Sequence, residues 1–244
     1  MKAKGCTHTG SRENNEDSYG IGELDDTLLL TVADGLGGYN AGEVASDLAV
    51  KEIQDTVMHL INTAATHREL LKLAIERANT SILQQARSTS EYSGMATTIV
   101  IALVQGSIAT IANVGDSRAY CISQERITRV TKDHSLVQSL IDMGDIDEEE
   151  ALGHPKKHVV LRSLGMEKAV KADFYEKSIV SGDILLLCSD GLTDTLKESE
   201  IKDIVVGSEK EKICTNLLEA ARIKSRDNIT IVVAHNEEGT RNAS

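Results

Sequence analysis

The chain is poor in aromatic residues and in positive charge. Its 244 residues include one Phe, five Tyr and no Trp, and 26 Lys and Arg stand against 38 Asp and Glu, for a formal net charge of −12. Proteins that stack bases or sugars on their surface use aromatic side chains, and nucleic-acid binders need a basic surface to meet the phosphates. We therefore expect no nucleic-acid partner and a core built from aliphatic side chains.

Long apolar runs are also missing. The longest unbroken aliphatic stretch is Ile99–Val104, whereas a membrane-spanning helix needs about twenty apolar residues. The first residues, MKAKGCTHTG, contain no apolar segment of the kind found in secretory signals. The sequence thus predicts a cytoplasmic protein with no membrane partner.

Cysteine and proline are scarce. The four cysteines form no C-x-x-C pair, and in a chain of this length we expect them to be reduced thiols in the cytosol; they are Cys6, Cys121, Cys188 and Cys214. Pro155 is the single proline, and no stretch rich in Pro, Gly and Ser divides the chain. Residues 1–236 are therefore predicted to form one domain, followed by a polar tail at 237–244. We expect a monomer.

The spacing of apolar residues changes along the chain. Residues 42–64 and 68–87 repeat them every three to five positions, as amphipathic helices do, and helical patterns return near 198–206 and 209–224. Short runs rich in aliphatic and β-branched residues predict strands, at 27–33, 97–104, 107–114, 118–123, 183–190 and 229–234. Strands grouped beside paired helices favour an α+β sandwich over a parallel sheet.

Residues 132–165 have a different composition, with many acids close together: Asp142, Asp145, Asp147, Glu148, Glu149 and Glu150. Their spacing does not fit a calcium-binding loop. A solvated charged surface is the simpler interpretation of this acidic run. We treat the segment as an insertion on the sandwich.

Acidic residues recur where predicted strands begin or end. They are Glu16 and Asp17 before a short segment, Asp34, Asp116 and Asp190 after apolar runs, and Asp227 before the last run. Any one of them could belong to an ordinary turn, since Asp-Gly is a turn signal. Strand ends meet at the rim of a sheet, however, and several carboxylates gathered there would repel one another unless a cation neutralised them. Because oxygen ligands select hard cations, a Mg²⁺ or Mn²⁺ cluster is the favoured interpretation.

Two further features accompany these acids. The glycines after Asp34 fit neither a dinucleotide fingerprint nor a Walker loop, and we interpret Gly35 as letting its backbone carbonyl approach a metal. Arg12 lies four residues before Glu16, and its guanidinium is a rigid fork that matches phosphate oxygens. The alternative is an ion pair with Glu13 or Glu16. Beside a hard-metal cluster, phosphate binding is favoured.

In their order along the chain, these segments resemble the metal-dependent protein serine/threonine phosphatases, the PPM or protein phosphatase 2C family, in its compact bacterial form. The resemblance covers residues 5–235. It is carried by the segments 12–17, 33–38, 41–46, 94–98, 113–118, 131–135, 148–155, 189–194 and 225–230.

The resemblance implies a four-layer α-β-β-α sandwich, a central antiparallel β-sandwich flanked by helix pairs, with two Mn²⁺ or Mg²⁺ ions at one edge. It implies that Asp34 bridges the ions and that Gly35 ligates one of them. Asp190 and Asp227 would hold the other, with Glu16 and Asp17 completing the second ion's shell directly or through water. Asp116 and Asp190 match acids that hold a third, weaker ion. Residues 132–165 would be a flap beside the active site that touches the substrate.

The function implied is hydrolysis of phosphoserine and phosphothreonine in proteins by a water bridging the two ions, in opposition to a Ser/Thr kinase. Arg12, Asp34 and Asp190 would carry the catalysis. Many eukaryotic members have His where this chain has Leu36, so the proton donor is left open between a metal-bound water and, as a weaker candidate, His134 of the flap. His154 and His158 are interpreted as structural. Two alternatives stay open: a regulator that dephosphorylates one dedicated partner, and a catalytically silent binding module.

Overall fold

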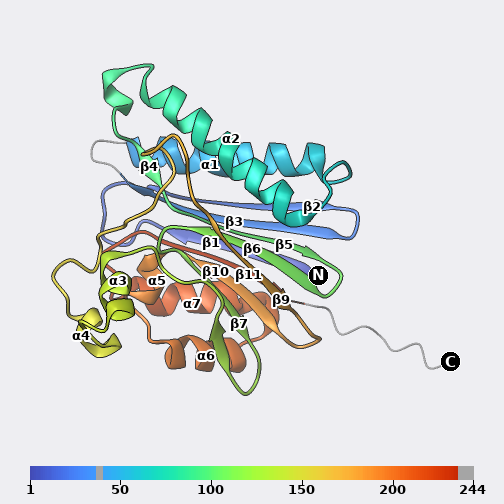
Figure 1. The fold of residues 1–244 in the computed structure, drawn as a ribbon. Helices are drawn as coiled ribbons and strands as arrows, with labels where there is room; N and C mark the ends of the chain where they lie inside the picture. Colours follow the sequence, from blue (N-terminus) through green and yellow to red (C-terminus); the bar gives the residue numbers. More distant parts are fainter. Residues whose placement is uncertain (37–40, 236–244) are drawn as a thin grey trace.

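The computed structural model describes residues 1–36 and 41–235, and within them the strands form two antiparallel sheets that lie face to face (Figure 1). One sheet has the order β1 (Lys2–His8), β11 (Ile229–His235), β10 (Ile184–Cys188), β7 (Arg118–Ile122), β8 (Ile127–Arg129). The other has the order β2 (Asp17–Leu24), β3 (Thr27–Leu36), β5 (Ile99–Gln105), β6 (Ile108–Val114), β9 (Asp173–Ser178), with the short β4 (Ala96–Thr97) beside β3.

Helices cover the outer face of each sheet (Figure 1). The long helices α1 (Ala41–Leu60) and α2 (His67–Ala86) share an apolar core with the β3 sheet, and α6 (Glu198–Gly207) and α7 (Ile213–Arg222) share one with the β10 sheet. The remaining helical segments are η1 (Ser90–Tyr92), α3 (Leu136–Met143), α4 (Glu148–Leu152), α5 (Asp190–Thr193) and η2 (Lys210–Lys212). The predicted α-β-β-α sandwich is confirmed.

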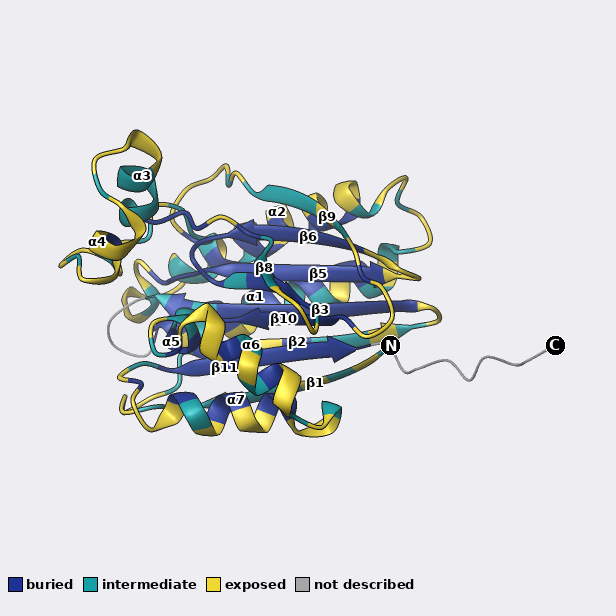
Figure 2. Cartoon of the chain, turned by 90° about the horizontal axis from the view of Figure 1, so that it is seen from below, coloured by how far each residue is buried: buried dark blue, intermediate teal, exposed yellow. Residues whose placement is uncertain are grey.

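The central strands read as continuous apolar runs because both of their faces are buried (Figure 2). In β5, Ile99, Ile101 and Leu103 pack toward α1 and α2, while Val100, Ala102 and Val104 pack toward the opposite sheet. Side chains alternate between the two faces of a strand, so an uninterrupted aliphatic run fills two separate cores. β3 and β10 follow the same rule.

The predicted helices and strands are confirmed to within a few residues, but the four edge strands β1, β2, β8 and β9 were not predicted. β1 (Lys2–His8) and β9 (Asp173–Ser178) each pair on one side only, and their sequences, KAKGCTH and DFYEKS, mix charged with apolar residues. An edge strand does not need an apolar run, so the pattern used for central strands could not find them. The predicted polar tail and part of the glycine loop lie outside the described residues.

Residues 132–165 contain two short helices that project from one end of the sandwich (Figure 1). Ser135 caps α3 through the backbone NH of Gln138, and Gly144 ends it in the left-handed conformation. Asp147 and Glu150 form a capping box at the start of α4. All six acids of the run are exposed, which agrees with its interpretation as a solvated surface. Two of them also have a local structural role as the cap of α4. We call residues 132–165 the flap.

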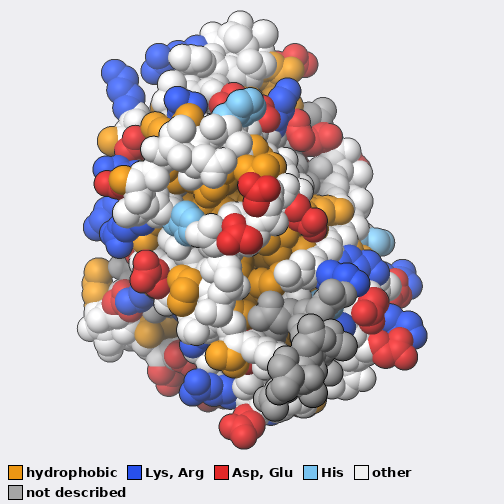
Figure 3. All heavy atoms as spheres, turned by 90° about the vertical axis from the view of Figure 1, so that its right-hand side faces the viewer, with side chains coloured by type: hydrophobic (Ala, Val, Ile, Leu, Met, Phe, Trp, Pro, Cys, Tyr) orange, Lys and Arg blue, Asp and Glu red, His pale blue; other side chains and the backbone are white. Residues whose placement is uncertain are grey.

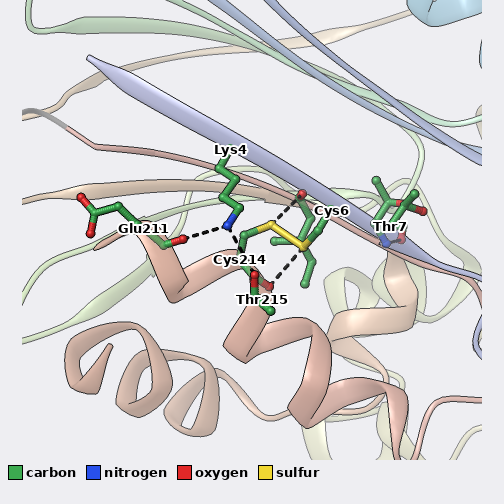
Figure 4. Close-up of a disulfide and its surroundings, with 9 residues drawn as sticks. Lys4, Cys6, Thr7, Glu211, Cys214 and Thr215 are labelled. Atoms are coloured by element: carbon green, nitrogen blue, oxygen red, sulfur yellow. Dashed lines mark hydrogen bonds between the residues drawn. A yellow bond between two sulfur atoms is a disulfide. The ribbon is translucent and has the colours of Figure 1, made fainter. Parts of the chain in front are cut away.

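Two of the four cysteines form a disulfide, so the prediction of four reduced thiols is wrong for this pair. Cys6 of β1 is joined to Cys214 of α7 (Figure 4). Beside it, the Lys4 ammonium donates to the backbone carbonyl of Glu211 at 3.0 Å. The two cysteines are 208 residues apart in the sequence, so no local spacing could reveal the pair. Cys121 and Cys188 are free and buried.

The end of the sandwich opposite the flap has no dominant sign of charge. Blue and red side chains are interspersed over the face in Figure 3, although acids outnumber basic residues in the sequence. Among residues 1–36 and 41–235, no helix combines the length and apolar character needed to cross a membrane.

The disulfide gives the first prediction. In non-reducing denaturant, a thiol reagent should label two cysteines per chain, and four after reduction. Because the bond closes a very long loop in the unfolded chain, reducing it should lower the free energy of unfolding by about 2–4 kcal/mol. The check is thermal or denaturant unfolding with and without dithiothreitol, with a Cys6→Ser/Cys214→Ser variant as the matched control that should not respond. Four reactive thiols in the untreated protein would contradict the bond.

Candidate active site

A hollow of about 770 Å³ opens at the edge of the two sheets beside the flap. Five of the predicted acidic residues line it together with Arg12 and Gly35; the acids are Glu16, Asp34, Asp116, Asp190 and Asp227. The sixth, Asp17, is buried and is hydrogen-bonded to Ser189 next to Asp190. The structure thus gathers residues from five separate segments of the sequence.

Asp17 and Asp34 are placed by strand pairing. They lie directly opposite each other in the antiparallel register of β2 and β3. Leu28, Leu30 and Val32 of β3 face the other sheet, and by the same alternation Asp34 points into the space between the sheets. The two carboxylates therefore meet where the inter-sheet core ends.

The backbone of Asp34 is fixed by a pair of threonines. The Thr97 hydroxyl donates to the Asp34 carbonyl at 2.9 Å, and the Asp34 NH donates to the Thr98 hydroxyl oxygen at 3.1 Å. That hydroxyl also lies 2.7 Å from the hydroxyl of Ser117. The segments 94–98 and 113–118 thus hold the acids in position, a role that their sequence pattern did not reveal.

Asp190 and Asp17 approach each other through Ser189. The Ser189 hydroxyl donates to Asp17 Oδ2 at 2.7 Å and accepts from the Thr230 NH at 2.9 Å. Gly191 follows Asp190 at the start of α5, and a Cβ there would collide with the backbone carbonyl of Asn228. Glycine therefore lets α5 approach the loop that carries Asp227.

Asn228 fixes the loop that carries Arg12 and Glu16. Its side-chain oxygen accepts from the Glu16 NH at 2.8 Å, and its amide donates to the carbonyls of Thr9 and Asn14, each at 2.9 Å. The Arg12 guanidinium donates to Asp227 Oδ2 at 2.8 Å. Arg12 thus pairs with Asp227 instead of Glu13 or Glu16, and its exposed guanidinium still lines the hollow.

Glycine is also required on the other side of Asp34. The Gly35 NH donates to the Glu16 carbonyl at 3.1 Å. A Cβ on Gly35 would collide with the backbone of Gly42 in α1 and of Glu16. Glycine is therefore needed at position 35 for the close packing of three backbone segments. Gly35 also lines the wall of the hollow.

The carboxylates are strongly perturbed by burial and by one another. Burial, followed by repulsion from Asp190, raises the pKa of Asp116 to about 8, and burial raises the pKa of Asp17 to about 7 despite the hydrogen bond from Ser189. The pKa of Asp34 is raised well above its ordinary value by burial and then by Asp17, and burial also raises that of Glu16. Asp17 Oδ1 and Asp190 Oδ1 are buried without a hydrogen-bond partner. An all-oxygen donor set with two unsatisfied buried oxygens fits hard divalent cations.

The histidines differ in their relation to the hollow. His134 is buried: its Nδ1 accepts from the Gly115 NH at 3.1 Å and its Nε2 lies 3.2 Å from Asp173 Oδ2. It ties the base of the flap to the turn after β6 and does not line the hollow. His158 does line it, with Nδ1 3.5 Å from Asp194 Oδ2 and 4.0 Å from Asp190 Oδ2. The two carboxylates raise the pKa of His158. The interpretation of His158 as purely structural missed this placement.

Comparison with known families matches residues 4–221 to the model described as "Protein phosphatase 2C". The chain belongs to the protein phosphatase 2C family. The metal dependence of that family agrees with the unsatisfied oxygens of the hollow.

Protein phosphatase 2C relatives resemble this chain over nearly its whole length. It is 39% identical to "Serine/threonine phosphatase stp" of Listeria welshimeri over 227 residues, which is 91% of this chain and 90% of the relative. The crystal structure of Stp1 from Staphylococcus aureus matches with a TM-score of 0.90 at 37% identity, over 97% of this chain and 95% of that one. A catalytic domain of PstP in complex with two manganese ions matches with a TM-score of 0.82 at 33% identity, over 95% and 96%.

The raised pKa values of this phosphatase 2C site predict its pH dependence without metal. An ordinary Asp in an unfolded chain has a pKa near 3.9, so between about pH 4 and pH 8 the folded protein binds more protons at Asp17 and Asp116 than the unfolded chain does. Stability must then fall as pH rises through this window. In chelator, the melting temperature should decrease by several degrees from pH 5.5 to pH 8, and saturating Mn²⁺ should largely remove that decrease. An Asp17→Asn variant, which cannot ionise there, should show a shallower decrease in chelator. A melting temperature that rises with pH would contradict the crowding of carboxylates.

Proposed function

We propose that this protein phosphatase 2C hydrolyses phosphoserine and phosphothreonine in other proteins. The observation that carries the proposal is the hollow itself, where five carboxylates and an exposed arginine line one space and Asp190 has a buried oxygen without a hydrogen-bond partner. Relatives named as serine/threonine phosphatases, 36–39% identical over most of the chain, support it. In this proposal residues 1–236 form one phosphatase domain that includes the flap at 132–165.

The acids would hold the metals and Arg12 would hold the phosphate. Asp17, Asp34 and Gly35 belong to the β3 sheet, with Glu16 next to Asp17, whereas Asp190 follows β10 and Asp227 precedes β11 of the other sheet. Two divalent ions bound there would supply a bridging water of lowered pKa and neutralise the phosphoryl oxygens. We expect Mn²⁺ or Mg²⁺, with Asp116 and Asp190 placed for a third, weaker ion. Asp227 holds the guanidinium of Arg12 so that its remaining donors face the hollow.

Phosphate monoesters hydrolyse extremely slowly without a catalyst, so the site must provide a large reduction of the barrier. Positioning and charge neutralisation supply most of it in phosphoryl transfer. The hydrogen bonds of Thr98, Ser189 and Asn228 keep the acids and Arg12 in fixed positions before substrate binds. His134, whose ring faces the base of the flap, is assigned a structural role.

The substrates would be phosphoproteins made by a Ser/Thr kinase, whose effect this phosphatase opposes. Kinases use ATP, so we place the protein in the cytoplasm. We also expect it to act as a monomer. The Cys6–Cys214 bond is the observation that points the other way, because disulfides are uncommon in reducing compartments. Alkylation of thiols in intact cells before lysis would show which state the pair adopts.

The first test compares a phosphothreonine peptide with and without Mn²⁺, in wild type and in Asp190→Asn. The variant loses one anionic ligand, so turnover should fall at least about a hundredfold and calorimetric Mn²⁺ binding should weaken, with circular dichroism unchanged. Asp203→Asn on the exposed surface of α6 makes the same chemical change away from the hollow and should keep full activity. Wild-type turnover in Asp190→Asn would contradict the metal assignment. Mn²⁺ binding with no turnover on any peptide would instead favour a dedicated partner or a silent binding module.

Arg12 gives a separate test. Arg12→Ala should raise the KM for phosphopeptides about tenfold with a smaller effect on kcat, because the lost guanidinium contributes mainly to phosphate binding. Arg12→Lys retains the charge without the fork of donors. Its KM should therefore lie between those of wild type and Arg12→Ala. Steady-state kinetics decide the matter: an unchanged KM together with a lower melting temperature would show that Arg12 serves mainly to hold Asp227.

A further inference from the structure

A second cavity, of about 500 Å³, lies between the flap and the segment that follows β10. We call it the flap pocket. Its apolar walls are Val137, Ile141, Ala151 and Leu152 of the flap and Leu196 after α5. Asp116 and Asp190 line both the flap pocket and the catalytic hollow. The two spaces therefore adjoin at the acids of the active site.

The flap helix α3 carries an apolar stripe that the rest of the protein covers only in part. Its sequence, LVQSLIDM, is strongly amphipathic, yet none of its residues is buried, and Figure 2 shows the flap as partly and fully exposed. In α4, Leu152 has 67% of its surface exposed. Amphipathic helices in folded proteins normally cover such a stripe. The stripe is thus available for another molecule that enters the flap pocket.

Three polar contacts join side chains within the walls of the flap pocket: Arg118 with Asp133 at 2.6 Å, Arg129 with Gln138 at 2.8 Å, and Lys157 with Asp194 at 2.7 Å. The other charged residues of the lining are Asp116 and Asp190, where the pocket adjoins the hollow, and Glu148, Lys197 and Glu198. A charged ligand would have to compete with these bonds and lose its own hydration. An apolar group would only remove water from Val137, Ile141 and Leu152. The side of the pocket formed by the apolar side chains of the flap therefore favours an apolar occupant.

We propose that the flap pocket binds an apolar side chain of the phosphoprotein substrate, from a residue close in sequence to the phosphorylated one. This inference rests on the proposed function, since it needs the phosphoryl group in the neighbouring hollow. Continuity between the two spaces at Asp116 and Asp190 puts the occupant on the same bound segment. The volume of the pocket falls in the range of cavities that hold organic ligands. The flap would thus select substrates by a hydrophobic contact beside the phosphate.

The test uses phosphothreonine peptides of small polar residues in which a single Leu replaces Ser at each position near the phosphothreonine. Because burying a large aliphatic side chain is strongly favourable, the best Leu peptide should exceed the all-Ser peptide about tenfold in kcat/KM. Ile141→Gln and Leu152→Gln should reduce this ratio to about one. Both side chains lie outside the buried core, so the variants should fold, which circular dichroism and melting temperature would verify.

Met143→Gln is the matched control. It makes a comparable change on α3, but Met143 is exposed and does not line the flap pocket, so the preference for Leu should persist. Hydrolysis of a small aryl phosphate, which has no group to place in the flap pocket, serves as the reference. An equal loss by Ile141→Gln on the aryl phosphate and on the Leu peptide would overturn the inference, as would a wild type that does not distinguish Leu from Ser.

A binding measurement separates this inference from the proposed function. Fluorescence anisotropy with nonhydrolysable phosphonate analogues of the Leu and Ser peptides reports the same preference without turnover. If no phosphate ester is hydrolysed but the Leu analogue binds about tenfold tighter and loses this advantage in Ile141→Gln, the pocket is supported while the hydrolytic function fails. Hydrolysis with equal binding of both analogues would overturn the pocket alone.

Discussion

The register between β2 and β3 is the constraint on which the site depends. It places Asp17 opposite Asp34, and it is itself set by the cores on the two faces of β3, with Leu29 on one side and Leu28 and Leu30 on the other. A shift by one residue would exchange the faces of the whole strand. The carboxylates would then leave the space between the sheets, and the aliphatic side chains would lose their positions as well. Packing of the core and placement of the ligands are therefore the same structural requirement.

The repulsion among the acids must be resisted by bonds that cross between the sheets. Ser189 follows β10 in one sheet, yet its hydroxyl donates to Asp17 in the other. Asn228, just before β11, holds the loop that leads into β2. These hydrogen bonds join the sheets at the edge where the apolar core no longer does so. They also leave Asp17 Oδ1 and Asp190 Oδ1 without hydrogen-bond partners, and a divalent cation would satisfy such oxygens.

The sequence was informative wherever chemistry and secondary structure share a simple pattern. Acids at the ends of apolar runs could be predicted to meet, because strand ends lie at sheet edges, and the hollow contains them. The supporting hydrogen bonds of Thr98 and Asn228 could not be predicted, since Thr and Asn are common and nothing in their spacing fixes a partner. The pairing of Cys6 with Cys214 could not be predicted either, because it depends on α7 packing beside the edge strand β1.

The flap is held in place by fewer buried contacts than the edge that carries the acids. The acids proposed to bind metal lie at or next to the ends of strands whose side chains are buried on both faces, so substitutions in those strands would cost stability. Helix α3 has no buried residue and is held by its caps and by a few bonds at its base, such as that between the Leu136 NH and the Val159 carbonyl. Changes in its apolar stripe should therefore alter what the flap contacts with little effect on the fold. Under the proposed function, an edge that performs the chemistry would in this way adjoin a surface that selects the substrate.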